Sequence, residues 1–89
     1  MLSFEAQKTA LLEFAQRERL DIVDTFTESQ TAKEPGRPVF NQMLERIERN
    51  EAEGILAWHP DRLARNSVDG GKIIFLIDSE KIKSLKFPT

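Results

Sequence analysis

The chain of 89 residues contains no cysteine and a single histidine, which removes several classes of site from consideration. Without cysteine there is no disulfide framework, no thiolate metal site and no cysteine nucleophile. No apolar run approaches the roughly 20 residues that span a bilayer, and the start, MLSFEAQK, lacks the basic and apolar blocks of a signal peptide. The net charge of −2 argues against a non-specific nucleic-acid coat. We therefore expect one small cytoplasmic domain.

Helical and strand-like patterns alternate along the chain. The predicted elements, in order, are a helix at 3–19 with Ser3 as its N-cap, a strand at 20–26, a polar loop at 27–38, a helix from Pro38 into ERNEAEG, a strand at 54–58, a helix within 62–78 that begins in RLARNS, and a strand in IKSLKFPT. This order is typical of an α/β fold in which helices flank a mostly parallel sheet. Because such sheets bind ligands beyond the carboxyl ends of strands, the polar clusters at 27–37 and 59–66 are expected to converge.

The segment WHPDRLARNS, 58–67, follows the apolar run GILAW and contains the best candidates for a binding site. Arg62 and Arg65 are three residues apart, so in the first turn of a helix they would share one face. Two guanidinium groups directed at one point suit phosphate oxygens, and the amides of a helix N-terminus would add to the attraction for an anion. Arg37, in the polar loop, is a candidate third cation. Three such charges would stabilise attack on a phosphodiester without a metal.

A plainer interpretation of the same residues stays open. Asp61 next to an arginine often forms only a surface ion pair, worth about 0–1 kcal/mol. Spacing alone favours that interpretation over a phosphate site. His59 is more typical of a turn than of a ligand or base, and Trp58 is more typical of core packing.

Four stretches, taken in order, carry a resemblance that covers essentially the whole chain. They are LSFEAQ, FTESQTAKEPGRPVFNQML, ILAWHPDRLARN and LIDSEKIKSLKFPT. Together they resemble the catalytic domain of the serine recombinases, the resolvase–invertase family, and especially its large serine integrases. The resemblance implies that residues 1–89 are part of a resolvase-like catalytic domain, an α/β fold with a mostly parallel sheet.

The resemblance also implies a chemistry. In the family a serine hydroxyl attacks a DNA phosphodiester, subunits of a tetramer exchange places, and the strands are resealed without a metal or nucleotide cofactor. The implied partners are DNA and further recombinase subunits, as a dimer or tetramer, and no membrane. The catalytic residues that it implies are Arg62, Arg65, Asp61 and Arg37, and the residues implied near the substrate are Gln7, Glu28 and Thr31.

One part of the family pattern is missing from the sequence. The family's nucleophilic serine ends a first strand, in an Arg-x-Ser pattern upstream of the LSFEAQ block, whereas Ser3 matches a later serine that opens the helix. Loss of that strand would leave backbone groups of its neighbours unpaired, so we expect a poorly stable, rearranged or self-associating monomer. We expect this chain alone neither to cut nor to join DNA.

Two other functions stay open from the sequence. The chain would act as a non-catalytic partner if it associated with full-length recombinases through its helices, with the apolar stretch IIFLI as the contact. It would act as a metal-dependent nuclease if Glu28 and Asp61 were its working residues. A requirement for magnesium would distinguish that nuclease from a serine recombinase.

Overall fold

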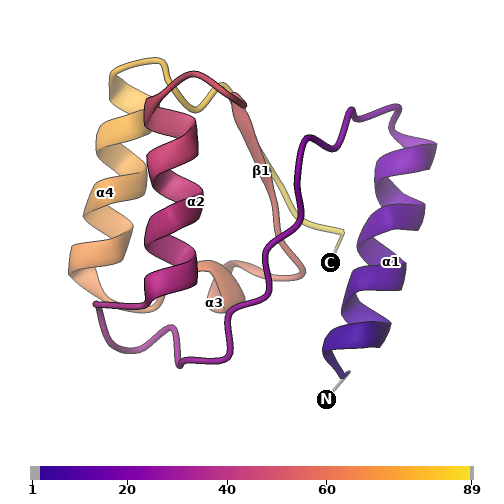
Figure 1. The fold of residues 1–89 in the computed structure, drawn as a ribbon, viewed down its shortest axis with the longest axis horizontal. Helices are drawn as coiled ribbons and strands as arrows, with labels where there is room; N and C mark the ends of the chain where they lie inside the picture. The colour runs from indigo at the N-terminus through magenta and orange to yellow at the C-terminus, as the bar shows by residue number, and fades with distance from the viewer. Residues whose placement is uncertain (1–2, 89) are drawn as a thin grey trace.

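A computed structural model describes residues 3–88 and has the predicted α/β character. Its elements are α1 (Phe4–Arg17), α2 (Pro38–Glu48), β1 (Gly54–Leu56), α3 (Pro60–Leu63), α4 (Ser67–Asp78) and β2 (Ser84–Lys86). The two strands pair in parallel, with Ile55 opposite Leu85. In Figure 1, α2 and α4 stand together on one side of β1, and α1 stands on the other side. None of the helices in this range is long and apolar enough to cross a membrane.

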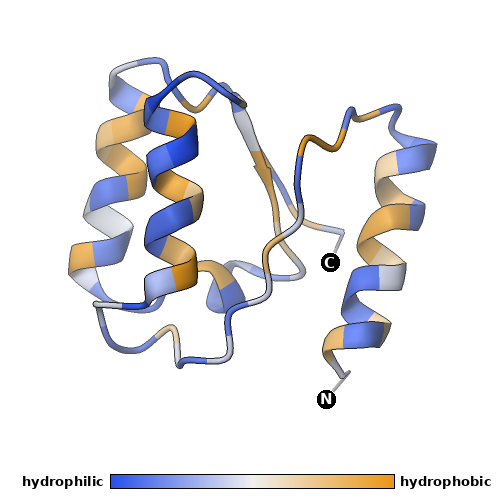
Figure 2. Cartoon of the chain, in the orientation of Figure 1, coloured by the Kyte–Doolittle hydropathy of each residue, from blue (hydrophilic) through white to orange (hydrophobic). Residues whose placement is uncertain are grey.

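The hydrophobic core lies between α2, α4 and the sheet. Both helices carry apolar residues (Figure 2); α2 turns an apolar stripe inward, whereas α4 buries Ile73 and Leu76 and leaves other apolar side chains exposed. The buried apolar side chains of this core are Phe40, Leu44, Ile47, Ile55, Leu63, Ile73, Leu76 and Ile82. The core therefore fixes α2, α3 and α4 relative to the carboxyl end of β1. Residues 58–67, called the arginine segment below, begin close to that end.

The helix boundaries follow from capping residues in the sequence. Ser3 caps α1, because its hydroxyl accepts a hydrogen bond from the Ala6 N–H at 3.2 Å. Pro38 occupies the first turn of α2, where its missing N–H costs no hydrogen bond. Asn66 caps α4 by accepting from the Asp69 N–H at 2.8 Å. The three predicted helices are therefore confirmed, and the third begins at Ser67, within RLARNS as predicted.

The predicted strand at 20–26 is wrong. This segment is extended, but in the described chain the sheet has only the strands β1 and β2, and 20–26 is in neither. A strand is stable only when a neighbour takes up its backbone groups, and residues 3–88 place none beside this segment. Side chains hold it instead. Asp24 forms an ion pair with Arg46 of α2, and the Arg46 Cζ lies 5.9 Å from the centroid of the Phe26 ring.

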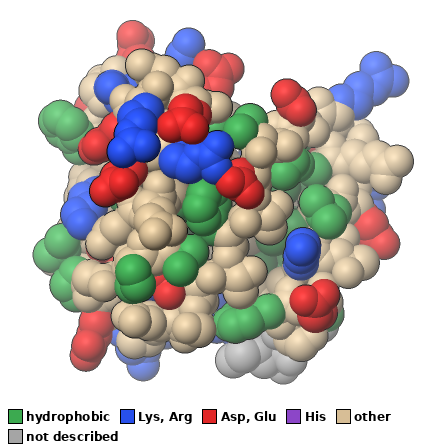
Figure 3. Space-filling model, in the orientation of Figure 1, with side chains coloured by type: hydrophobic (Ala, Val, Ile, Leu, Met, Phe, Trp, Pro, Cys, Tyr) green, Lys and Arg blue, Asp and Glu red, His purple; other side chains and the backbone are tan. Residues whose placement is uncertain are grey.

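Charged side chains interleave over the C-terminal end of α2. Figure 3 shows blue and red groups alternating there, without a field of one sign. Arg46 contacts Asp24 and also donates to Glu51 at 3.1 Å, while Arg49 lies 3.9 Å from Glu45. Exposed pairs of this kind add little stability individually, so the contact between Asp24 and Arg46 holds the segment 20–26 only weakly.

Candidate functional site

The polar loop and the arginine segment come together in space. The backbone carbonyl of Ala32, in the loop, accepts the N–H of Arg65 at 2.8 Å and the Nδ2 of Asn66 at 3.1 Å. Ala32 and Asn66 are 34 residues apart in the sequence, so only the fold brings them together. The predicted convergence of the two clusters that follow strands is confirmed, although the earlier segment is not a paired strand.

Arg37, at the end of the loop, lies inside the protein rather than in the open loop. Its side chain is 2% exposed, and its Nε and Nη2 donate to Asp69 Oδ2 at 3.2 and 3.0 Å. Nη2 also donates to the backbone carbonyl of Leu63 at 2.6 Å. The Arg37 Cζ lies 4.0 Å from the centroid of the Phe40 ring. The positive charge of Arg37 is therefore already paired with the carboxylate of Asp69, inside the protein and next to the Leu63 carbonyl.

Asp69 and Asn66 complete this buried network, and sequence reasoning did not select either. Asp69 is fully buried; its Oδ2 accepts from Arg37 and also from Asn66 Nδ2 at 2.9 Å. Its Oδ1 has no hydrogen-bond partner within residues 3–88. The pattern Asn-x-x-Asp before an apolar run is a helix-start signal and could have located both residues. It would not have shown that Asp69 is buried against an arginine.

Arg62 and Arg65 do not lie together on one helix. Arg62 is in the short helix α3, which ends at Leu63, and Ala64 is extended at φ −158° and ψ 137°. Arg65 therefore lies in the connection, before α4 begins. The hypothesis that both share the first turn of one helix is wrong, because Asn66 starts a new helix after them. Both residues are exposed. Across residues 3–88 neither guanidinium takes part in an ion pair or side-chain hydrogen bond.

Asp61 lies beside His59 rather than in a pair with Arg62. His59 Nδ1 accepts the Asp61 N–H at 3.1 Å and caps the short helix. The Asp61 Oδ2 is 3.9 Å from the same nitrogen, and both side chains are about half exposed or more, at 49% and 67%. No ion pair joins Asp61 to an arginine in the described chain, so the expected surface Asp–Arg pair is absent there. The turn role predicted for His59 is confirmed.

Glu28 serves as an acceptor for the start of α2. Its Oε1 accepts the N–H groups of Val39 and Phe40, both at 3.0 Å, and its Oε2 accepts the Gln30 N–H at 3.3 Å. The N-cap residue, Arg37, supplies no side-chain acceptor, so this carboxylate satisfies amides that would otherwise be unpaired. Glu28 thereby fixes the helix start from which the Arg37 side chain extends.

The two remaining predicted residues lie on either side of this arrangement. The Thr31 hydroxyl accepts the Lys33 N–H at 3.2 Å and so shapes the loop next to Ala32. Gln7 is half-buried on α1, the helix on the other side of the sheet. Among residues 3–88, no three His, Cys, Asp or Glu side chains gather as ligands for a metal ion.

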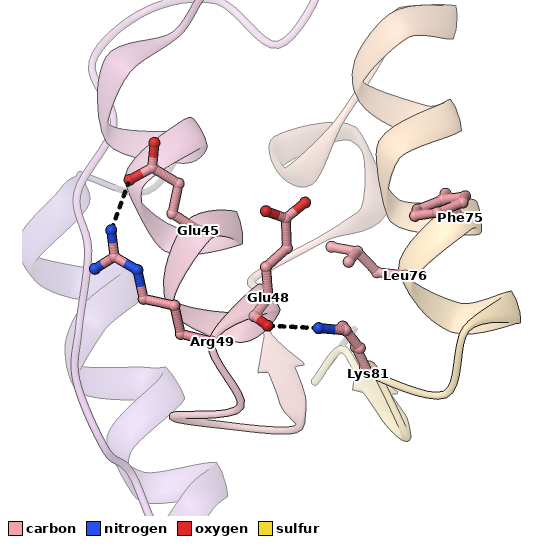
Figure 4. Close-up of a pocket in the computed structure, with 6 residues that line it drawn as sticks. All are labelled: Glu45, Glu48, Arg49, Phe75, Leu76 and Lys81. Carbon is pink, nitrogen blue, oxygen red and sulfur yellow. Dashed lines mark hydrogen bonds and ion pairs between the residues drawn. The ribbon is translucent and has the colours of Figure 1, made fainter.

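A hollow of about 600 Å³ lies at the opposite end of α2 (Figure 4). It is lined by Glu45, Glu48, Arg49, Phe75, Leu76 and Lys81. Lys81 Nζ donates to the Glu48 carbonyl at 2.6 Å, and Arg49 faces Glu45. The cations of this hollow are engaged within the chain, whereas those of the arginine segment are not.

Comparison with known proteins agrees with this fold. The catalytic domain of ISC1926 TnpA, an IS607-like serine recombinase, has a TM-score of 0.81 and 16% identity, over 96% of this chain and 56% of that one. The catalytic domain of TP901-1 integrase has a TM-score of 0.76 and 24% identity, over 93% of this chain and 65% of that one. The chain thus spans less than two thirds of either. No curated protein matches it. The family model for the resolvase N-terminal domain matches residues 2–86, and the chain therefore belongs to this family.

Proposed function

We propose that the 89 residues hold the phosphate-binding part of a serine recombinase catalytic domain, and that Arg62 and Arg65 bind the scissile phosphate of DNA. The observation that carries this proposal is the contrast between these two arginines and Arg37. Arg37 is buried in an ion pair, whereas Arg62 and Arg65 are exposed and unpaired in the described chain, on either side of Leu63. Cations left without acceptors on a fixed backbone are suited to an external anion.

The proposed binding rests on the chemistry of guanidinium groups. Each presents a planar fork of donors that matches two phosphate oxygens, and its charge does not titrate near neutral pH. During attack on phosphorus, negative charge grows on the phosphoryl oxygens, and donors held in place beforehand stabilise it. Arg62 and Arg65 would supply this stabilisation, with no metal or nucleotide required of this chain. Asp61 would orient the neighbouring arginine when DNA is bound.

The other candidate residues are proposed to shape the site rather than to react. Glu28 holds the start of α2, Thr31 holds the loop, and Arg37 supports the backbone between the two binding arginines. Gln7, on α1, is proposed to lie near the bound DNA. None of the serines in the chain is assigned as the nucleophile, so we propose that these 89 residues bind DNA phosphate and neither cut nor join the strand.

The proposal is tested by DNA binding of the intact chain. We expect binding to a labelled short duplex in low salt, measured by fluorescence anisotropy, to be lost in the double variant Arg62→Ala/Arg65→Ala. In the single variants Arg62→Ala and Arg65→Ala, the loss of one phosphate contact should reduce the magnitude of the slope of log affinity against log salt by about 0.9. The matched control is Arg49→Ala, because Arg49 is an exposed arginine at the other end of α2, with a side chain 69% exposed. Equal losses in the control and the double variant would contradict the proposal.

A second function is favoured by a separate observation on α4. This helix exposes four large apolar side chains: Val68 at 51%, Ile74 at 59%, Phe75 at 67% and Ile77 at 41%. Large apolar groups left exposed in this number on one helix favour a contact surface. We propose that this surface associates with another recombinase subunit, either as part of a homo-oligomer or as a non-catalytic partner. Sedimentation of the chain with and without Phe75→Asp tests it; an unchanged sedimentation coefficient and a monomeric parent chain would contradict it.

A further inference from the structure

The buried network joins the start of α2 to the end of α3 and the start of α4, which lie 26 and 32 residues further along the chain. Asp69, in the first turn of α4, holds Arg37 at the start of α2, and Arg37 holds the carbonyl of Leu63 at the end of α3. Leu63 lies between the two exposed arginines of the candidate site. A displacement of Arg37 would therefore move the backbone from which both arginines extend.

Asn66 connects the same network to the polar loop. Its Oδ1 caps α4, and its Nδ2 donates both to Asp69 Oδ2 at 2.9 Å and to the Ala32 carbonyl at 3.1 Å. The same carbonyl accepts the Arg65 N–H at 2.8 Å. One amide side chain thus links the helix start, the buried carboxylate and the loop, and it does so directly beside Arg65.

The ion pair is made through a single carboxylate oxygen. Arg37 Nε and Nη2 both donate to Asp69 Oδ2, and Nη2, which carries two hydrogens, also donates to the Leu63 carbonyl at 2.6 Å. Asn66 Nδ2 donates to the same Oδ2. One buried carboxylate oxygen therefore holds both Arg37 and Asn66, and Arg37 in turn holds the backbone of the arginine segment.

We infer that Asn66 and Asp69 are positioning residues, which hold the loop and Arg37 behind Leu63 and so set where Arg62 and Arg65 point. The inference rests on the proposed binding of phosphate by these two arginines. In this inference Arg37 supports the site and does not bind the phosphate, and the loop and the arginine segment move together. Loosening one should loosen the other.

The test uses the intact, ¹⁵N-labelled chain and the variant Asn66→Ser. A serine hydroxyl still accepts the Asp69 N–H and caps α4, but both Nδ2 donors are lost. Asp69→Asn is a second variant, which keeps the size of the side chain and removes its charge. The control is Ser3→Ala, which removes the cap of α1, remote from the network. Backbone mobility is measured in the free protein by ¹⁵N relaxation and amide exchange at residues 30–34 and 61–66. Affinity for a short DNA duplex is measured separately.

We expect Asn66→Ser to loosen both segments together, to speed exchange at the Arg65 amide, and to weaken DNA binding about tenfold, as the loss of one or two good hydrogen bonds would. Ser3→Ala should change neither quantity. Rigid behaviour at 61–66 in both network variants would overturn the inference, whatever the DNA affinity. If the parent chain binds no DNA, the proposed function fails, and the relaxation data alone decide whether the network couples the loop to the segment.

Discussion

The two parts of this chain, before and after Arg37, are stabilised by different means. Among residues 3–88 the part after Arg37 contains all of the buried apolar side chains except Ala15. The earlier part has one well-capped helix, but Phe4 and Leu12 on that helix are 53% and 45% exposed. Val23, which follows the helix, is 54% exposed. The later part is held by its core, whereas residues 24–32 of the earlier part contact the later one through polar groups.

This difference explains how the candidate site is assembled. Both exposed arginines, Arg37 and Asp69 belong to the part with the core, which can hold them firmly. The loop that contacts them belongs to the other part, and it is attached through Glu28 and Ala32. We therefore expect the site's arginines to be fixed by the core and its loop to depend on a few hydrogen bonds.

The largest expected effect comes from breaking the buried ion pair. Asp69→Ala leaves the Arg37 guanidinium buried without its carboxylate, and such changes cost about 3–5 kcal/mol of unfolding free energy. For a chain of this size that loss is a large part of the total stability. Urea denaturation followed by circular dichroism measures it. The exposed pair of Lys83 and Glu53, 3.6 Å apart, gives the control: Lys83→Ala should change the midpoint very little. Similar losses in both variants would show that burial of the pair is unimportant.

Truncating apolar side chains in each part tests the comparison directly. Ile47 is 2% exposed on α2, whereas Leu12 is 45% exposed on α1. Ile47→Ala should cost about 2–5 kcal/mol, because it removes buried methyl groups and leaves a cavity. Leu12→Ala should stay within about 0.5 kcal/mol. Equal costs in the same denaturation experiment would mean that α1 is packed as tightly as α2, and the distinction between the two parts would be lost.

A smaller effect is expected from the acceptor that attaches the loop to α2. Glu28→Ala removes the partner of two amides at the helix start, and loss of such a cap costs about 1 kcal/mol. Amide exchange at Val39 and Phe40 should speed up as well. Glu34→Ala, in the same loop, is the matched control and should leave both quantities unchanged. No change on replacing Glu28 would mean that the loop is held elsewhere.

The smallest effect is a pH dependence of the contact between the extended segment and α2. A hydrogen bond from the Thr25 N–H, at 2.7 Å, and the guanidinium of Arg46 lower the pKa of Asp24 below its ordinary value. A lowered pKa means that Asp24 stabilises the fold above about pH 3.9, the value in an unfolded chain, and that this contribution is lost as pH falls through the lower folded pKa. Because Asp24 is exposed, the change should be slight. Carboxyl NMR titration measures it, with Asp78 for comparison; a pKa for Asp24 at or above the ordinary value would contradict it.

Much of the fold follows from local sequence signals, and the part that does not depends on partners. Ser3, Pro38 and the apolar spacing after it predict α1 and α2 because caps and periodicity are local. The strand at 20–26 was wrong because strand formation needs a neighbour, which propensity does not reveal. The sequence also selected Arg62 and Arg65, but it could not show that Arg37 is buried, since its partner Asp69 lies 32 residues away.

The central claim is that Arg62 and Arg65 face the DNA phosphate while Arg37 supports them from behind. The most direct measurement is NMR of the arginine Nε–Hε groups during titration of the intact chain with a short DNA duplex in low salt. The account predicts that the Arg62 and Arg65 signals shift and become protected from exchange, while the Arg37 signal is protected before DNA is added and shifts little. Large shifts at Arg46 and Arg49 with none at Arg62 and Arg65 would contradict it.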